Sequence, residues 1–484
     1  MTTTSPDTIP LDDIVTLDAT ALSAAIKTKA VSCREVMSAH LARIEAVNGQ
    51  VNAIVSLRDP AVLLAEADAA DEDLARGHWR GPLHGFPHTV KDLAATKGLR
   101  TTLGSPLFKD NVPDTDALFV ERLRAAGAIL IGKTNVPEFG LGSHTYNPVF
   151  GTTRNAYDQR FSAGGSSGGA GAALALHMVP LADGSDFGGS LRNPAGWNGV
   201  FGLRPSQGRV PALPGPEGYL QQLGTDGPMA RTVADLSLLL SVMSGYDSRA
   251  PLSIAQPPLP AALLEGDVAG QRIGWLGNFG GAVPVEDGIL ELGLSALGSL
   301  QQAGCVAEEA SLDMAWDRIW ACWLVWRHSL MAGRYRTTYE NPEKRGLLKP
   351  EMIFEIEGGL GLTATALYDA SETRTLLYQR FLALFERYDA LALPSAQVFP
   401  FAQELDWPHA IAGTPMDTYH RWIEIMVPGS LSGCPVICVP AGFGGANNLP
   451  SGLQLIGRPG GDRELLKLAA AFEAVSRPKQ RLPR

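Results

Sequence analysis

Residues 164–192 read GGSSGGAGAALALHMVPLADGSDFGGSLR, a segment in which two serine-bearing glycine clusters, at 164–169 and 188–190, flank a run of small residues. Glycine loses more backbone freedom on folding than any other residue, so this density indicates unusual backbone geometry or the close approach of a ligand. A serine set among glycines presents its hydroxyl beside unobstructed backbone N–H groups. Acyl transfer needs a nucleophile together with oxyanion donors, so the segment predicts such a site.

The overall composition is that of a soluble globular protein and disfavours some partners. The chain has 484 residues, of which 45% are hydrophobic and 19% charged, and its formal net charge is −10 at pH 7. This acidity disfavours nucleic acid and anionic membrane surfaces as main partners. The amino terminus lacks the basic and apolar regions of a signal peptide, and the apolar run at 236–242 is too short to span a bilayer. We therefore expect a cytoplasmic protein that binds a small molecule, either as a monomer or as a homodimer.

Neither the cysteines nor the glycine motifs indicate a metal or a cofactor. No CxxC pair and no Cys/His cluster with zinc-ligand spacing occurs, which predicts buried, reduced thiols. The alternative of a nucleotide-binding protein is disfavoured because the chain lacks the GxxxxGK[ST] phosphate loop, and we expect neither metal nor cofactor. The cysteines are Cys33, Cys305, Cys322, Cys434 and Cys438.

The pattern of apolar residues predicts alternating strands and helices. Residues 1–15 are expected to form a polar arm, and residues 32–35 fit a capping box that begins a helix ending near residue 48. Residues 264–385 are expected to be mainly helical. This alternation implies an α/β sheet with helices on its faces. The predicted buried strands are 128–133, 390–394, 435–440 and 452–456, and the other clear helices are 116–126, 230–244 and 462–475.

Strand-like runs in both the first and the last third of the chain favour one large domain over two. Within residues 1–484 we expect a helical amino-terminal part at 1–75 and a core carrying the chemistry at 76–245. A variable, mainly helical insertion is expected at about 300–430. Residues 431–484 are expected to return to the core sheet.

Ser190 is the candidate nucleophile because residues 186–189 place consecutive free N–H groups directly before it. Successive amides of this kind form an anion-binding nest. A serine also needs a base, and a lysine serves when burial lowers its pKa toward neutrality. Lys91 and Lys133 both stand at the end of an apolar, strand-like run, and their local chemistry does not choose between them.

An α/β-hydrolase esterase is the alternative enzyme class, because residues 164–168 match its GxSxG motif with Ser166 as nucleophile. That motif needs a strand directly before it, together with an acid and a histidine late in the chain. Residues 157–163 are polar, and the late histidines, His409 and His420, stand in polar surroundings.

The glycine-rich segment and five further motifs resemble the amidase signature family of serine hydrolases, and the resemblance covers most of the chain. It implies the family fold, a single large twisted mixed β-sheet with helices on both faces. The further motifs are GPLHGFPHTVKD at 81–92, GKTNVPEF at 132–139, GTTRN at 151–155, GLRP at 202–205 and GLQLIGRP at 452–459.

The resemblance also implies a Ser–cis-Ser–Lys triad. Ser190 matches the nucleophile, Ser166 the bridging serine that follows a cis peptide bond at Gly165, and Lys91 the base. Lys133 then belongs to a family motif without matching the base. The oxyanion donors that the resemblance implies are the amides of Phe187, Gly188, Gly189 and Ser190.

Further positions are assigned supporting roles. We expect Ser167 to stabilise its loop, Asp186 to organise the nest through backbone bonds, and Arg192 to form a buried charge contact. By family analogy Gly140 and Leu141 should line the pocket beside the nucleophile. A glycine at 140, where the family usually has a larger residue, suggests a roomier site.

The pattern is most similar to urethanase and arylamidase members, which implies hydrolysis of small apolar aryl amides and carbamates. A glutamine-type amidotransferase subunit is the alternative within the family, but its tyrosine-rich segment is not found. Residues 314–330 instead carry Trp316, Trp320 and Trp323 at helical spacing. Such a stripe packs into a core more often than it lines a pocket, although an aromatic wall for an aryl substrate is compatible with it.

Overall fold

The computed structural model describes residues 11–476, apart from 214, 216, 221, 258 and 261–263, together with residue 483. Residues 1–10 of the predicted polar arm lie outside the described residues. The prediction of a polar arm is wrong for the residues that follow, because Leu11–Ile14 form a short helix, α1.

Eleven of the described strands build one mixed sheet, which confirms the predicted fold class, and β10 Ala410–Ile411 pairs separately with β11 Thr414–Pro415. Parallel pairs (β2–β3, β2–β4, β7–β8 and β7–β9) stand beside antiparallel ones such as β5–β12, which joins the first half of the chain to its end. The order across the sheet is β1-β3-β2-β4-β6-β5-β12-β13-β9-β7-β8. The bounds are β1 Ile54–Val55, β2 Pro87–Lys91, β3 Ile129–Thr134, β4 Ala182–Asp186, β5 Phe201–Arg204, β6 Thr225–Ala230, β7 Arg272–Trp275, β8 Val306–Glu309, β9 Ala390–Pro394, β12 Val436–Gly444 and β13 Leu449–Gly457.

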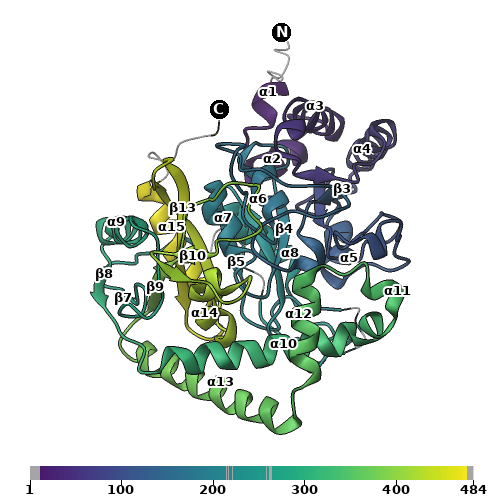
Figure 1. Cartoon of the computed structure of the whole chain (residues 1–484). Helices are drawn as coiled ribbons and strands as arrows, with labels where there is room; N and C mark the ends of the chain where they lie inside the picture. Colours follow the sequence, from purple (N-terminus) through teal and green to yellow (C-terminus); the bar gives the residue numbers. More distant parts are fainter. Residues whose placement is uncertain are drawn as a thin grey trace.

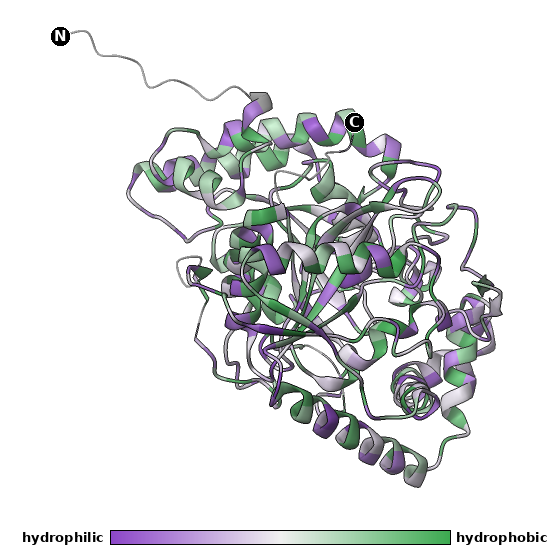
Figure 2. Cartoon of the chain, turned by 90° about the vertical axis from the view of Figure 1, so that its left-hand side faces the viewer, coloured by the Kyte–Doolittle hydropathy of each residue, from purple (hydrophilic) through white to green (hydrophobic). Residues whose placement is uncertain are grey.

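Helices cover the sheet, and a helical layer closes the end of the molecule opposite the termini (Figure 1). That layer consists of α10 Trp316–Glu340, α11 Pro342–Arg345, α12 Pro350–Leu360 and α13 Ala364–Phe385, with α10 packed between α12 and α13. In Figure 2 the helices alternate hydrophobic and hydrophilic residues along their lengths, as expected when one face packs inward. The other main helices are α2 Ala19–Lys27, α3 Cys33–Val51, α4 Pro60–Ala75, α5 Leu118–Ala125, α6 Gly168–Ala175, α7 Arg192–Asn198, α8 Val233–Met243, α9 Ile289–Gln302, α14 Val427–Ser432 and α15 Asp462–Ser476.

The capping box at the start of α3 is confirmed, whereas the predicted end of that helix is not. The Ser32 side chain accepts a hydrogen bond from the Glu35 amide, and the Glu35 carboxylate accepts from the Ser32 amide in return. The helix continues past residue 48 to Val51 and ends where Asn52 adopts a left-handed conformation with φ 52°. Asparagine tolerates this conformation better than most residues, so the turn forms there without glycine.

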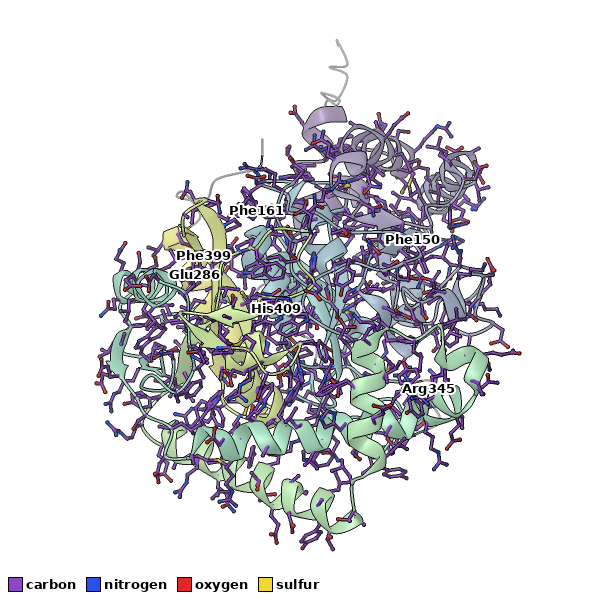
Figure 3. All side chains as sticks on the ribbon, in the orientation of Figure 1. Phe150, Phe161, Glu286, Arg345, Phe399 and His409 are labelled. Atoms are coloured by element: carbon purple, nitrogen blue, oxygen red, sulfur yellow. The ribbon has the colours of Figure 1, made fainter. Side chains whose placement is uncertain are left out.

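Residues 264–385 contain two strands that the helical interpretation missed. β7 and β8 pair in parallel and form the edge of the sheet beside β9. No residue of β8 is fully buried, and its sequence VAEE has no apolar run to mark it. After β7, the backbone amide of Phe399 donates a hydrogen bond to the Glu286 carboxylate at 2.9 Å, and both residues are labelled in Figure 3.

The hydrophobic core lies in two clusters, one under the amino-terminal helices and one under the helical layer. The four tryptophans of α10, Trp316, Trp320, Trp323 and Trp326, belong to the second cluster and are all buried. All five cysteines are buried and free, which confirms the predicted reduced thiols. None of the described helices combines the length and the apolar composition needed to cross a membrane.

Candidate active site

Three neighbouring strands bring the polar groups of the site to one edge of the sheet. Lys91 is the last residue of β2 and Asp186 the last residue of β4, and these two strands run parallel, so their carboxyl ends meet. β6 runs antiparallel to β4, so its first residues, Thr225 and Asp226, lie beside the end of β4. The loop before α6 adds Ser166 and Ser167 to the same edge.

Lys91 is the centre of a cluster of hydroxyl groups. Its Nζ lies 2.9 Å from Ser166 Oγ, 2.8 Å from Ser167 Oγ and 3.0 Å from Ser185 Oγ, with the Ser185 carbonyl at 3.2 Å. The side chain is buried, and burial lowers the pKa of Lys91 to about 7, although Asp226, Asp186 and Asp183 act in the opposite direction. A lysine with this pKa is partly uncharged near neutral pH and can accept a proton from a bonded hydroxyl.

Ser166 and Ser190 open into one cavity together with Lys91. The peptide bond between Gly165 and Ser166 is cis, and Ser166 Oγ is the atom that meets the lysine. The carbonyl of Ser190 accepts a hydrogen bond from the Ser167 amide at 3.3 Å. The Ser190 hydroxyl makes no hydrogen bond to any described residue, so the Ser190–Ser166 hydrogen bond of the predicted relay is not formed in this structure. Catalytic contacts of this kind commonly tighten only when substrate is bound.

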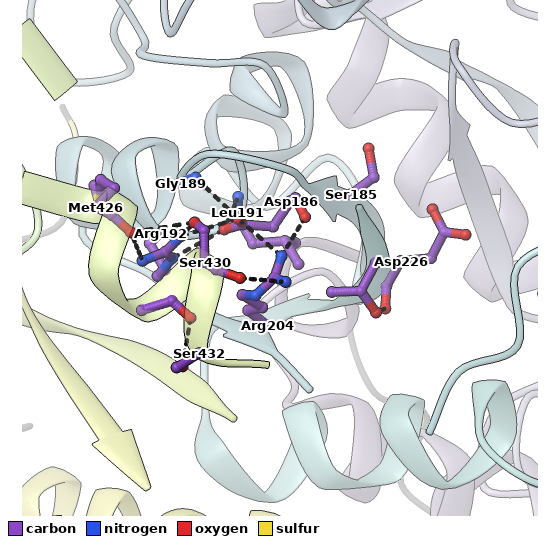
Figure 4. Close-up of polar contacts among 12 residues, drawn as sticks. Ser185, Asp186, Gly189, Leu191, Arg192, Arg204, Asp226, Met426, Ser430 and Ser432 are labelled. Atoms are coloured by element: carbon purple, nitrogen blue, oxygen red, sulfur yellow. Dashed lines mark hydrogen bonds and ion pairs between the residues drawn. The ribbon is translucent and has the colours of Figure 1, made fainter. Parts of the chain in front are cut away.

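Asp186 organises the loop that precedes Ser190 (Figure 4). Its Oδ1 accepts from the Gly189 amide at 2.9 Å, and its Oδ2 accepts from the Leu191 amide at 3.1 Å. Gly189 has a φ of +104°, a conformation that glycine adopts readily. Because the Gly189 N–H donates its hydrogen bond to Asp186, it is not available to a ligand in the cavity. Of the four predicted oxyanion donors, the amides of Phe187, Gly188 and Ser190 therefore remain as a prediction.

Two buried arginines hold Asp186 in place. Arg192 donates from Nε and Nη2 at 3.0 Å each, and Arg204 donates to the carbonyl of Asp186. Burial alone would raise the pKa of Asp186, but Arg192 and Arg204 outweigh it and hold that pKa well below its usual range. Arg192 also donates to Ser430 Oγ at 2.7 Å, which ties the loop to α14. The loop is therefore fixed by contacts with a segment far along the chain.

The cavity has a volume of about 420 Å³, and Gly140 and Leu141 contribute to its wall. The predicted aromatic stripe of α10 does not line it. Trp316, Trp320 and Trp323 face the core, and the later turns of the same helix line the cavity instead. Those later residues are Arg327, Ser329, Leu330, Met331, Gly333, Arg334 and Tyr335.

Lys133, left open as a second base from local chemistry, is separated from this cluster by the sheet. In the β2–β3 register Lys133 is directly opposite Val90, so its side chain shares the face of Val90 and not that of Lys91. Its Nζ donates to the Ala94 carbonyl and to Thr96 Oγ1, both at 2.7 Å. Although burial lowers the pKa of Lys133 to about 8, no serine of the cavity lies among its hydrogen-bond partners.

The esterase alternative lacks the arrangement it requires. The described residues directly before Ser166 form only isolated bridges, such as that between Arg154 and Ser162, and not a strand leading into the motif. His409, labelled in Figure 3, is exposed, and His420 is buried among aromatic rings of the helical layer. Neither histidine is among the residues that line the cavity. Within the described part of the chain, no three His, Cys, Asp or Glu side chains form a group that could hold a metal ion.

Several residues of the site escaped the sequence-based reasoning. Ser185 bonds the lysine, Asp226 lines the cavity, and Arg327 reaches it from α10. Ser185 stood in the GSD run beside Asp186, but only the strand register shows which face it occupies. Arg327 is buried and forms an ion pair with Glu355, and no local sequence pattern predicts this pairing.

Comparison with known proteins places this chain in a family. A family model described as Amidase matches residues 35–466. A glutamyl-tRNA(Gln) amidotransferase subunit of Moorella thermoacetica is 36% identical over 96% of this chain and 98% of its own length. An acylamidase of Rhodococcus erythropolis is 35% identical over 95% of each chain. Among solved structures, a bacterial aryl acylamidase of the amidase signature enzymes superposes with a TM-score of 0.89 at 29% identity, covering 95% of this chain and 96% of that one.

Proposed function

This chain belongs to the amidase signature family of hydrolases, and from that premise we propose that it cleaves C–N bonds of small apolar aryl amides and aryl carbamates through an acyl-enzyme on Ser190. The observation that carries the proposal is the Lys91–Ser166 hydrogen bond of 2.9 Å, made by a buried lysine inside the cavity that Ser190 lines.

The proposed reaction moves one proton out and back. Neutral Lys91 accepts a proton from Ser166, which accepts one from Ser190 as its oxygen attacks the carbonyl. The amides of Phe187, Gly188 and Ser190 stabilise the oxyanion, and one such donor lowers the barrier by about 3–4 kcal/mol. The relay then protonates the leaving amine, and water hydrolyses the acyl-enzyme. From a carbamate the acyl-enzyme is a carbonate ester, whose hydrolysis releases alcohol and carbon dioxide.

The cavity wall supports an apolar substrate. Phe139, Leu141, Phe187, Leu330 and Met331 contribute to the wall that also carries the serine hydroxyls. Cavities that are mostly apolar with a few converging polar groups bind small organic molecules of this kind. The aryl acylamidase neighbour and the acylamidase relative support amide cleavage, and the carbamate activity is our extension.

A glutamine-dependent amidotransferase subunit is the second candidate, because a relative of that name is 36% identical over most of the chain. Glutamine brings an α-carboxylate that needs a cation. The buried guanidinium of Arg327 already has Glu355 as its counter-ion, and Asp226 adds a negative charge to the cavity. Arg334 also lines the cavity and is a second cation on its wall, so the substrate panel decides between the two candidates.

A substrate panel tests the proposal with purified protein. The wild type should release 4-nitroaniline from both 4-nitroacetanilide and ethyl N-(4-nitrophenyl)carbamate, whereas Ser190→Ala and Lys91→Ala should not. A long-chain fatty amide and glutamine complete the panel. Ammonia release from glutamine at a higher kcat/KM than either aryl substrate would overturn the proposal in favour of the amidotransferase.

A further inference from the structure

Asp226 lines the same cavity as the proposed base without belonging to the predicted triad. It is the second residue of β6, directly opposite Ser185 of β4 in the antiparallel ladder. Directly opposite residues point to the same face of a sheet, and Ser185 Oγ is 3.0 Å from Lys91 Nζ. Asp226 also lines the cavity that contains Lys91 and Ser190. Its carboxylate therefore shares a face and a cavity with the lysine; Figure 4 shows Asp226 beside Ser185.

Three acids act on the charge of Lys91, and two of them are already occupied. Asp186 is paired with Arg192 and a second buried arginine. Asp183 lies 3.0 Å from the His88 ring and accepts from the backbone amide of Lys91, also at 3.0 Å. Asp226 differs from both, because no described residue donates a hydrogen bond to its carboxylate or forms an ion pair with it.

The remaining charges on the cavity wall have other neighbours. Arg327 of α10 is paired with Glu355 and donates to the Tyr419 hydroxyl at 2.6 Å. Arg334 is exposed and lies over the ring of Tyr335, its cation 5.3 Å from the ring centre. The Glu217 carboxylate accepts from two backbone amides of its own loop, at 2.6 and 2.8 Å. Among the described groups, Lys91 is thus the cation that acts on Asp226.

We propose that Asp226 is a positioning residue for the reaction, acting through Lys91: its carboxylate stabilises the ammonium form of the lysine and so determines the pH at which the base becomes active. This inference rests on the proposed function, because it assumes that Lys91 is the base. Asp226 need not touch the substrate to exert the effect.

The direction of the effect follows from the charges. A carboxylate favours the charged form of a neighbouring amine, so Asp226 raises the pKa of Lys91, against the lowering by burial. The active form is the neutral amine, so activity rises with pH through the pKa of Lys91. Removing the carboxylate lowers that pKa and moves the rise in activity to lower pH.

The two groups also share protons. Burial and Asp183 raise the pKa of Asp226 to about 7, with Lys91 acting in the opposite direction, and burial lowers the pKa of Lys91 to about 7 as well. Two interacting groups that titrate together release their protons in macroscopic steps that belong to the pair. A proton on Asp226 leaves Lys91 free to act as a base. The wild-type acid limb should therefore be broader than that of a single ionisation.

The test is the pH profile of kcat/KM for 4-nitroacetanilide, measured from pH 5 to 9 for the wild type and Asp226→Asn. We expect the midpoint of the acid limb to fall by about one pH unit in Asp226→Asn, and the limb to narrow to a single ionisation. One unit below the wild-type midpoint, the variant should then retain about half of its plateau activity. The wild type, with its broader limb, should retain more than about a tenth, so the two should differ by at most about fivefold.

Matched variants separate the charge from other effects. Asp226→Glu keeps the charge and should leave the midpoint in place, while Asp226→Ser removes it and should reproduce the shift. Glu217 carries a negative charge in the same cavity but is not among the acids that raise the pKa of Lys91. The midpoint of Glu217→Gln should therefore equal that of the wild type. Thermal unfolding establishes that each variant is folded. If Asp226→Asn does not fold, Asp226→Ser tests the role of the Asp226 charge in its place.

The outcomes distinguish this inference from the proposed function beneath it. An unmoved acid limb in the folded charge-removing variants overturns the role of Asp226 and leaves Lys91 as the base. If the wild-type profile has no acid limb, or if Lys91→Ala is fully active, then Lys91 is not the base. The pH dependence of fluorophosphonate labelling of Ser190 gives a second readout. Labelling uses the same base but needs no protonation of a leaving amine, so its acid limb should shift by the same amount.

Discussion

Replacing Gly188 by alanine should disable the oxyanion loop with little effect on the rest of the site. A Cβ at Gly188 would lie 2.9 Å from Cη2 and 3.0 Å from Cζ2 of the Trp323 ring. Gly188 does not have a left-handed φ, so its backbone accepts alanine and the contact alone decides the outcome. Trp323 is 1% exposed and packs edge-on against Phe187, their ring centres 5.5 Å apart.

The size of the effect follows from these contacts. The loop and the indole must separate by about half an ångström to restore an ordinary contact, and a close-packed core resists moving the ring. The loop therefore moves, and with it the amides of Phe187, Gly188 and Ser190. Losing one oxyanion donor lowers kcat about 10²- to 10³-fold, so we expect a fall of about 10²-fold in kcat. KM should change by less than about threefold, because the ground-state carbonyl binds weakly to these donors.

Steady-state kinetics on 4-nitroacetanilide measure the effect, and a second substitution tests its cause. Trp323→Phe removes the two ring atoms in question, so the double variant Gly188→Ala/Trp323→Phe should recover at least about tenfold of the lost kcat. Gly224→Ala is the matched control, since its Cβ would meet Phe187 at an ordinary 3.6 Å. A folded Gly188→Ala variant that retains kcat within about threefold of the wild type would show that the Trp323 contact does not displace the oxyanion loop.

Three further substitutions test other parts of the account. Gly140→Ala places a Cβ 2.7 Å from a neighbouring leucine methyl and 3.4 Å from Ser166 Oγ, at a φ of +74°, so kcat/KM should fall about tenfold for a bulky acyl group and less for acetyl, in a comparison of acyl anilides. Arg192→Met leaves Asp186 buried without its main partner and should lower the free energy of unfolding by about 3–5 kcal/mol in denaturant titration; a loss below about 1 kcal/mol would contradict the assigned pairing. Lys91→Met should stay folded, because it replaces a buried amine with an apolar side chain, yet lose at least about 10³-fold in kcat; residual activity within about tenfold of the wild type would exclude it as the base.

The strands were predictable where apolar residues are continuous, and not where a strand is exposed. The apolar runs predict the interior strands β9 and β3 to within a residue, and the carboxyl end of β2 predicts where the polar groups of the site lie. The edge strand β8 is exposed at both ends and carries two glutamates, so it gives no such signal. Edge strands are commonly built this way, because charge discourages pairing with other chains.

The composition of the site was harder to predict than its position. Lys91 and Lys133 follow similar runs, and only the β2–β3 register places them on opposite faces of the sheet. Asp226 is brought to Lys91 by the β4–β6 ladder across a sequence separation that no local pattern spans. The tryptophan stripe of α10 correctly predicts a buried helix face, but burial in a core and in a cavity wall produce the same spacing. The structure resolves this ambiguity by lining the cavity with Arg327 and the turns that follow it.

Covalent trapping with a fluorophosphonate, followed by peptide mapping, tests the assigned nucleophile most directly. We expect one phosphonylated residue, Ser190, with labelling lost in Ser190→Ala and slowed but still measurable in Ser166→Ala. A label found on Ser166, or labelling that persists unchanged in Ser190→Ala, would contradict the assignment.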